Sequence, residues 1–383
     1  MAVADALAGG EKLSDTPPAR PNLVYAVKTG EHVKILKRHV KTGEETTLLE
    51  YDEVVEAAHL RDVWPEFPPS VALASSAPTL VYVDGDEVIA YDLAQGTGST
   101  VLKRLSEGND RGGSLENASL TPNATRLCCA YALYAPISAA DGSRVALLMA
   151  QYEGNQLTVL SLDGAVACVL PNKPNAGLIT SNDPTWSGGD LLLPSVGGYA
   201  DPGLYVSMAS DLCEPAEITA GIDENGRYDT ASWSPDNEWI AASYQREALD
   251  PTSTSLVLVA RDGSESRVLV EDGLNYWPLF ASDGRSLLFV QRTAALCNEG
   301  TESVWRMKLL TGEMHRLADV PAGWSVRSLE WLDNRHLALA PYAGRCEYPR
   351  KCSTRLLVLD SDTGLVFYAS PAPGVVTYLG FLP

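Results

Sequence analysis

Residues 228–245 read YDTASWSPDNEWIAASYQ, and this stretch contains the pattern that decides the fold. A short apolar strand ends at Trp233, the chain turns through Ser-Pro-Asp-Asn, and a second apolar strand starts at Trp239 and Ile240. Proline presets its own φ angle, while Asp and Asn side chains bond to nearby backbone, so this composition favours a tight turn. The stretch therefore predicts a β-hairpin.

The same pattern returns in residues 276–291, YWPLFASDGRSLLFVQ, where Phe280 stands in place of Trp233. An apolar anchor, a polar turn and an apolar strand recur at Leu73, Leu120, Trp186, Trp233, Phe280, Trp331 and Phe381. The spacings are 47, 66, 47, 47, 51 and 50 residues, and we interpret residues 134–154, YAPISAADGSRVALLMAQYEG, as an insertion in the long interval. A regular period of this length is typical of a repeat array.

Each interval contains further short strands, such as residues 255–263 (SLVLVARDG) and 266–273 (SRVLVEDG). Four short strands joined by Asp-Gly or Thr-Gly turns make one blade of a propeller. Helical periodicity is scarce, and we expect a helix only within residues 52–64. The fold class predicted is all-β, with seven blades.

The two ends of the chain supply complementary parts of one blade. Residues 375–383, VVTYLGFLP, stop where the second strand of a blade is expected, and residues 23–51 provide three more strands. Pairing the C-terminal strand with the N-terminal strands removes an exposed sheet edge. We therefore predict a propeller over residues 22–383 that this pairing closes.

The sequence WSPD-x-x-WIA at residues 233–241 resembles the TolB-like (WD40-like) repeat of β-propellers. The match weakens to FASDG at residues 280–284 and LTPN at residues 120–123. The resemblance extends over residues 22–383 and implies the propeller fold. Families of this kind include binding scaffolds, periplasmic assembly factors, peptidase gating domains and sugar lyases, so the resemblance does not imply one activity.

The net charge of −20 excludes some classes of partner. Such a charge repels nucleic-acid phosphates and anionic lipids, so we expect no nucleic-acid partner. No apolar run is long enough to span a membrane as a helix. Residues 1–21 lack the basic start and apolar core of a secretory signal, and we interpret them as a flexible lead-in that is compatible with a removed export signal.

The seven cysteines include one suggestive pair. We predict a disulfide between Cys346 and Cys352, which lie six residues apart in a predicted hairpin loop. Cys168 and Cys213 fall on outer strands of neighbouring blades and could also pair. Cysteines in exposed loops favour an oxidising compartment, so we expect the protein to be extracytoplasmic, that is, secreted or periplasmic.

In propellers the innermost strands line a central channel, and the loops that enter those strands form one face. Four residues before each anchor, near the predicted channel mouth, lie Pro69, Glu116, Asn182, Asp229, Tyr276, Arg327 and Thr377. The next position in each repeat, including Asp183 and Trp277, is expected to turn to the opposite side because strand side chains alternate.

This polar ring has two interpretations. Glu116, Asp183 and Asp229 could hold Ca²⁺, or one carboxylate could act as a general base with Arg327 as the clamp for an anion. Alternatively, the ring only caps strands and solvates the channel. No other cofactor is expected, and no zinc-ligand spacing or familiar catalytic motif is present in the sequence.

Three long hairpin loops, residues 246–254, 293–302 and 342–355, lie on consecutive blades of the same predicted face. Aromatic residues accompany them in the connections: Trp64, Phe67, Tyr276, Trp277 and Trp324. Together they could form an aromatic-rimmed cleft suited to a sugar or a peptide.

We therefore expect a monomeric binding module for a protein or carbohydrate partner, with Glu116, Asn182, Asp183, Asp229, Tyr276, Trp277, Trp324 and Arg327 as the ligand-binding residues. The alternative is a lyase or hydrolase at the channel mouth that uses Asp229 or Glu116 together with Arg327.

Overall fold

The hairpin predicted at residues 228–245 forms in the computed structural model, where β17 (Arg227–Trp233) pairs antiparallel with β18 (Trp239–Gln245). In its turn, the Ser234 N–H donates to the Trp239 carbonyl over 2.8 Å, and the Trp239 N–H donates to Ser234 Oγ over 2.9 Å. Asn237 adopts a φ of 61°, a left-handed conformation that Asn tolerates because its side chain is short and polar. The turn residues thus satisfy the backbone of the hairpin.

The structure describes most of the chain. The described residues are 22–39, 42–53, 70–74, 77–84, 87–104, 125–127, 132–139, 141–151, 154–162, 166–170, 185–195, 202–219, 227–245, 253–271, 273–293, 300–343, 355–369 and 375–382.

These residues form seven sheets, and we number the blades along the chain by their innermost strands. Blade 1 contains β4 (Val71–Leu73), β5 (Thr79–Asp84), β6 (Glu87–Asp92), β7 (Thr97–Arg104) and β8 (Thr125–Leu127). Blade 2 contains β9 (Ala132–Ser138), β10 (Arg144–Gln151), β11 (Gly154–Ser161) and β12 (Val166–Leu170). Blade 3 contains β13 (Thr185–Ser187), β14 (Asp190–Ser195), β15 (Gly203–Met208) and β16 (Asp211–Glu217). Blade 4 contains β17, β18, β19 (Ser255–Ala260) and β20 (Ser266–Val270). Blade 5 contains β21 (Leu274–Phe280), β22 (Ser286–Arg292), β23 (Glu302–Lys308) and β24 (Met314–Val320). Blade 6 contains β25 (Trp324–Trp331), β26 (His336–Ala343), β27 (Leu357–Asp360) and β28 (Val366–Ala369). Blade 7 contains β29 (Val375–Leu382), β1 (Asn22–Thr29), β2 (His32–His39) and β3 (Glu45–Asp52).

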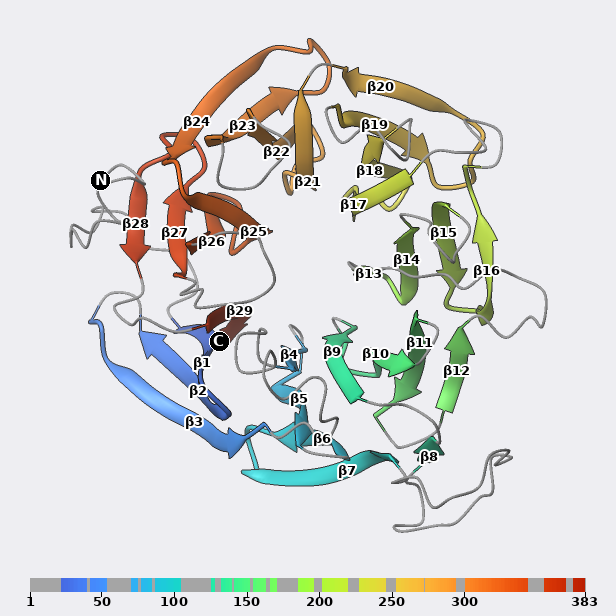
Figure 1. Cartoon of the computed structure of the whole chain (residues 1–383), viewed down its shortest axis with the longest axis vertical. Coiled ribbons are helices and arrows are strands. Elements are labelled where there is room, and N and C mark those ends of the chain that lie inside the picture. Colours follow the sequence, from blue (N-terminus) through green and yellow to red (C-terminus); the bar gives the residue numbers. More distant parts are fainter. Residues whose placement is uncertain are drawn as a thin grey trace.

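The seven blades stand around a common centre (Figure 1), as the sequence predicts. The strands nearest to that centre are β4, β9, β13, β17, β21, β25 and β29. In blade 7, β29 pairs antiparallel with β1, so that Phe381 lies opposite Leu23 and Gly380 opposite Val24. This sheet therefore joins the last described strand of the chain to the first three.

Apolar side chains fill the spaces between neighbouring blades. In the described part of the chain there are seven buried clusters, one for each pair of adjacent blades. Leu288 and Val304 of blade 5, for example, pack against Leu337 and Leu357 of blade 6. Burial of each large aliphatic side chain contributes about 1.5–3 kcal/mol, so these interfaces hold the ring together.

The ring has two faces that differ in their connections. At the entry face, innermost strands begin and second strands end, as at Arg227 and Gln245 of blade 4, which are paired. At the turn face lie the tight turns that follow the innermost strands, such as residues 234–238 and 281–285. The long hairpin loops predicted at 246–254, 293–302 and 342–355 connect strands at the entry face, although parts of each lie outside the described residues.

Blade 2 differs from the prediction. Its innermost strand is β9, which overlaps the stretch that the sequence suggests is an insertion, and the predicted anchor Leu120 lies outside the described residues. The turn after β9 has the pattern of the other blades: the Ala139 N–H donates to the Arg144 carbonyl, and Gly142 has a φ of 69°. Polar Ser138 occupies the anchor position and pairs with Val145, so the pattern of apolar anchors does not identify this blade.

A fifth strand extends blade 1. The short strand β8 pairs in parallel with the outermost strand β7, whereas the sequence places residues 125–127 in the hairpin of the next blade. Residues 54–69, which include most of the helix expected within residues 52–64, lie outside the described part of the chain, as does the lead-in at 1–21. No helix that could cross a membrane occurs among the described residues.

Both predicted cysteine pairings stay predictions, because three of the four side chains lie outside the described set. Cys213 on β16 forms a disulfide bond. The side chain of its predicted partner, Cys168, lies outside the described set, as do Cys346 and Cys352. Strands β12 and β16, which carry Cys168 and Cys213, are in contact, so the proposed pairing of these two residues remains a prediction.

A buried ion pair links blades 7 and 1 at the entry face. Lys28 Nζ lies 2.5 Å from Glu53 Oε2, and the side chains are only 0% and 2% exposed. The second carboxylate oxygen of Glu53 accepts a hydrogen bond from the Ser70 N–H over 2.8 Å. Burial lowers the pKa of Lys28, and the neighbouring Glu53 opposes that effect.

Replacement of Glu53 by Ala should lower the free energy of unfolding by about 3–5 kcal/mol, because it removes the carboxylate that balances a buried ammonium group. Urea denaturation followed by tryptophan fluorescence measures this loss. Glu313→Ala is the matched control, because Glu313 pairs with Lys308 over 2.6 Å at an exposed position. We expect no change in its unfolding midpoint, and equal effects of the two substitutions would contradict this assignment.

Candidate functional site

Irregular pairing of the innermost strands shapes the entry face. In blade 4 the register shifts between Tyr228 and Ala231, in blade 5 between Tyr276 and Leu279, and similar shifts occur in blades 2, 6 and 7. Such β-bulges change the direction of side chains and are common beside functional sites. The predicted positions Asp229, Trp277 and Arg327 all fall within these shifts, so simple alternation does not decide where they point.

Trp277 connects three blades. Its backbone N–H donates to Thr230 Oγ1 of blade 4 over 2.9 Å, and its indole Nε1–H donates to the Val326 carbonyl of blade 6 over 3.2 Å. Its φ of 53° is unusual for a bulky residue, and backbone strain of this kind clusters at ligand sites. Trp324 packs with Trp277 against the cluster between blades 5 and 6. Both predicted aromatic residues are therefore partly buried and support the entry face.

Arg292 lies at the end of β22, directly opposite Glu302 at the start of β23. Its Nε donates to Glu302 Oε1 over 2.7 Å, and its guanidinium carbon lies 5.0 Å from the centre of the Tyr276 ring. The remaining Glu302 oxygen accepts the Val326 N–H over 2.5 Å. The carboxylate and the aromatic ring thus hold Arg292 in place, because a guanidinium can donate to a carboxylate and stack on an aromatic ring at the same time.

Asp229 lies on β17, the innermost strand of blade 4, within electrostatic range of Arg292. Burial raises the pKa of the Asp229 carboxyl, and the positive charge of Arg292 partly opposes this shift. No hydrogen bond or ion pair joins the two side chains within the described part of the chain. A desolvated carboxyl group near a fixed guanidinium is an arrangement that often marks a functional site.

The predicted site residues are only partly described. Asp229, Tyr276, Trp277 and Trp324 lie on the innermost strands of blades 4, 5 and 6. Arg292 stacks on Tyr276 and acts electrostatically on Asp229. Glu116, Asn182 and Asp183 lie outside the described residues, as does the side chain of Arg327. Within the described chain, no group of three or more His, Cys, Asp or Glu side chains could hold a metal ion.

Arg292 and Glu302 are absent from the set that the sequence suggests. The predicted site residues precede the anchors on the innermost strands, whereas these two residues lie on the second and third strands of blade 5. Opposite charges at both ends of the predicted loop 293–302 are the signal that could have identified them, because hairpin pairing places those ends side by side.

Glu330 is a second residue that the sequence did not suggest. It precedes the anchor Trp331 on the innermost strand β25 and pairs with Ala338 of β26. Its side chain is exposed by surface area, but the strand lies at the centre of the ring, and the density of surrounding protein there raises its pKa to about 7. No ion pair or hydrogen bond of Glu330 is present in the described part of the chain, so no neighbouring cation offsets the shift.

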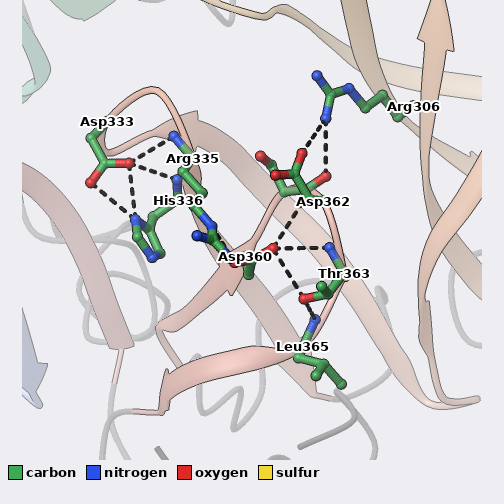
Figure 2. A network of polar contacts seen from close by, with 9 residues as sticks. Arg306, Asp333, Arg335, His336, Asp360, Asp362, Thr363 and Leu365 are labelled. Atoms are coloured by element: carbon green, nitrogen blue, oxygen red, sulfur yellow. Dashed lines mark hydrogen bonds and ion pairs between the residues drawn. The ribbon is translucent and has the colours of Figure 1, made fainter. Parts of the chain in front are cut away.

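Near the turn face, the charged side chains form hydrogen bonds and ion pairs with one another and with the backbone (Figure 2). Asp360 accepts hydrogen bonds from the backbone of Asp362 and Thr363 and from Arg335 Nε, the last over 2.6 Å. Burial opposes ionisation of Asp360, but these hydrogen bonds together lower its pKa. Arg306 of blade 5 donates to Asp362 of blade 6 over 2.8 Å.

The same network contains a histidine. Asp333 accepts the N–H groups of Arg335 and His336 and contacts the His336 ring nitrogen over 2.9 Å (Figure 2). His336 is only 3% exposed. These polar groups bind one another and close turns, so the network stabilises blade 6.

Replacement of Glu330 by Gln should remove a pH dependence of stability. The carboxyl binds its proton more tightly in the folded state than in the unfolded state, so folding of the wild type should weaken as pH rises from about 5 to about 8. Urea denaturation across that range measures the difference between the two proteins. Parallel pH profiles would contradict the raised pKa of Glu330.

Comparisons with known proteins support the fold. No family model matches the chain, and no curated protein matches it in sequence. Among solved structures, an oligogalacturonate lyase in complex with manganese is similar with a TM-score of 0.55 and 12% identity, covering 91% of this chain and 93% of that one. A puromycin hydrolase matches with a TM-score of 0.55 and 14% identity, covering 91% of this chain and 53% of that one.

TolB from Acinetobacter baumannii is also similar, with a TM-score of 0.45 and 14% identity over 94% of this chain and 83% of that chain. At these identities the likeness concerns the fold alone. The seven observed sheets and the similarity to the lyase and the hydrolase show a seven-bladed β-propeller, and the repeat at residues 233–241 resembles the TolB-like repeat.

Proposed function

We propose that the protein is a monomeric, extracytoplasmic binding module that holds a protein or carbohydrate partner on its entry face. The observation that carries this proposal is the arrangement of Arg292 above Tyr276, with Asp229 nearby. Arg292 Nε donates a hydrogen bond to Glu302, whereas Nη1 and Nη2 of Arg292 make no hydrogen bond to the described residues. A fixed aromatic ring and uncommitted donors suit recognition of a polar ligand.

The contrast between the two faces supports this choice. At the turn face, Arg306, Arg335 and Asp360 are engaged in ion pairs and turn hydrogen bonds (Figure 2). At the entry face, Asp229 and part of the Arg292 guanidinium have no such partners in the described chain. Uncommitted charged groups cost desolvation energy, and a ligand can compensate for this cost.

The extracytoplasmic location rests on cysteine chemistry. The disulfide of Cys213 supports an oxidising compartment, because cytosolic thiols are normally kept reduced. The net charge of −20 supports a partner other than nucleic acid.

Arg292→Ala should weaken partner binding at least about tenfold, because it removes the donors and the stacked cation. Wild-type and variant proteins would be applied to the same glycan and extracytoplasmic-protein arrays, and each positive ligand would then be titrated. Arg306→Ala is the matched control, because Arg306 is also an ion-paired arginine of blade 5 but lies toward the turn face. Equal binding by wild type and Arg292→Ala would contradict the proposed location of the site.

The alternative is an enzyme at the same face, and the raised pKa of Asp229 favours it over other catalytic assignments. Asp229 would act as the general base, and Arg292 would stabilise developing negative charge. Arg327 and Glu116 remain proposed contributors, as does Ca²⁺ held by Asp229 with Glu116 and Asp183.

In that case Asp229→Asn should lower kcat by a factor of about 100 to 10,000, because an amide cannot accept the substrate proton. Turnover would be measured on a panel of uronate, glycoside and ester substrates, with circular dichroism as the control for folding. Unchanged turnover of an active substrate by Asp229→Asn would exclude Asp229 as the base.

A further inference from the structure

We propose that Cys213 forms its disulfide with Cys168, and that this bond is a redox-sensitive clasp at the outer rim between blades 2 and 3. Cys213 is disulfide-bonded in the structure, and its place in the fold points to the partner. The clasp encloses the innermost strand of blade 3, so its reduction should loosen that blade without unfolding the ring. It acts on the ring itself and does not depend on the ligand of the entry face.

Cys213 lies where the two blades meet. It belongs to β16, the outermost strand of blade 3, and its side chain packs against the buried cluster between blades 2 and 3. That cluster includes Val159 of β11, which is fully buried. Strand β16 also contacts β12, the outermost strand of blade 2. The disulfide of Cys213 therefore lies beside an edge strand of the neighbouring blade.

The register of blade 2 places a second cysteine position at this boundary. Residue 168 of β12 lies opposite Val159 of β11, and Val159 belongs to the cluster that Cys213 contacts. Residues directly opposite each other in an antiparallel pair share one face of the sheet, so position 168 is on the face of blade 2 that meets blade 3. The other cysteines lie outside β12 and β16, at positions 128, 129, 297, 346 and 352.

The proposed bond closes a loop of chain that contains most of blade 3. Strands β13, β14 and β15 lie between residues 168 and 213. The innermost of them, β13, has three residues, whereas β17 and β21, the innermost strands of blades 4 and 5, have seven each. A cross-link lowers the entropy that the chain gains when such a segment opens. The clasp therefore stabilises an innermost strand that has a short ladder of its own.

The boundary between blades 2 and 3 is held at both ends of its apolar cluster. At the inner end, Trp186 Nε1 of β13 donates to the Ile137 carbonyl of β9 over 2.8 Å. The contact between β12 and β16 is at the outer end. We infer that the disulfide is the rim contact of this boundary.

Two other boundaries have ion pairs in the corresponding role. Asp190 of blade 3 pairs with Arg261, which follows β19 of blade 4, and Arg306 of blade 5 pairs with Asp362 of blade 6. Ion pairs do not respond to thiol reductants, whereas a disulfide does. Reduction should therefore act on the boundary between blades 2 and 3 and spare these two.

Reduction by a dithiol would open the clasp. Cleavage of the S–S bond takes up two electrons and two protons and leaves two thiols, while the dithiol is oxidised to its own disulfide. Cys213 is only half-buried, so a small reductant can approach it. In an oxidising compartment the bond persists, which agrees with the proposed extracytoplasmic location.

Mass spectrometry of the full chain tests the pairing. Free thiols are alkylated first, and the protein is then digested without reductant. We expect a cross-linked peptide that contains residues 168 and 213. A peptide that joins Cys213 to any other cysteine overturns the proposal.

Hydrogen exchange of the folded protein tests the clasp. With dithiothreitol, we expect the amides of β14 and β15 to exchange at least about tenfold faster, while those of β22 in blade 5 keep their rate. The double variant Cys346→Ser/Cys352→Ser is the control for other disulfides, and it should show the same difference. In Cys168→Ser/Cys213→Ser the exchange should already be fast, and dithiothreitol should change nothing.

Two results of this experiment contradict the clasp. One is equal exchange of β14 and β15 with and without dithiothreitol in the wild type. The other is an increase that is spread evenly over all seven blades, because it would mean general destabilisation. The comparison uses folded wild-type protein, so it decides the question even if a cysteine variant fails to fold.

Thermal unfolding gives an independent check of the pairing. Cys168→Ser and Cys213→Ser break the same bond, so each single variant and the double variant should lower Tm by the same amount, about 3–5 °C. Shifts that add in the double variant would show that the two residues act separately, and the proposed bond would then be wrong.

Discussion

The fold depends on the burial of both faces of every sheet. An isolated four-stranded sheet with apolar residues on both sides would leave two hydrophobic surfaces in water. The seven clusters of the described chain lie between neighbouring blades, and that of blades 6 and 7 includes Leu356 and Val376, which are far apart from Leu23 in sequence. Each blade thus completes the core of the next one, and the arrangement around a centre follows from this requirement.

At the β-bulges, the side chains no longer follow the regular repeat and differ from blade to blade. Within the hairpins, pairing follows the repeat, as at Trp233 opposite Ile240 and Phe280 opposite Leu287. Toward the entry face the register shifts, and Asp229 and Trp277 occupy the added positions. An innermost strand tolerates such shifts because one of its edges has no strand partner, and Pro278 can occupy the bulge of blade 5 for the same reason.

Two equally buried carboxylates carry out the same structural task for cations that differ in exposure. Glu53 and Glu302 each bind one cation of their own blade and one backbone N–H of the next blade. This bridging fixes the entry of the next innermost strand, where a bulge or a connection would otherwise leave an N–H group without an acceptor.

The sequence alone predicts the all-β class and the number of blades. Each repeat of an apolar strand, a polar turn and another strand pairs as an antiparallel hairpin, and the number of repeats gives the number of blades. The spacing did not locate blade 2 correctly, since Ser138 stands where an apolar anchor was expected and the turn through Asp141 and Gly142 carries the pattern instead.

The candidate site was predictable only in part. Asp229 and Tyr276 follow from their positions before the anchors, whereas the grouping with Arg292 and Glu302 depends on the packing of blade 4 against blade 5 and on hairpin register. The pKa of Glu330 likewise depends on the protein that surrounds the ring centre. Local pattern decides which strands form, but electrostatic and ligand-binding properties depend on distances between residues that only the assembled ring sets.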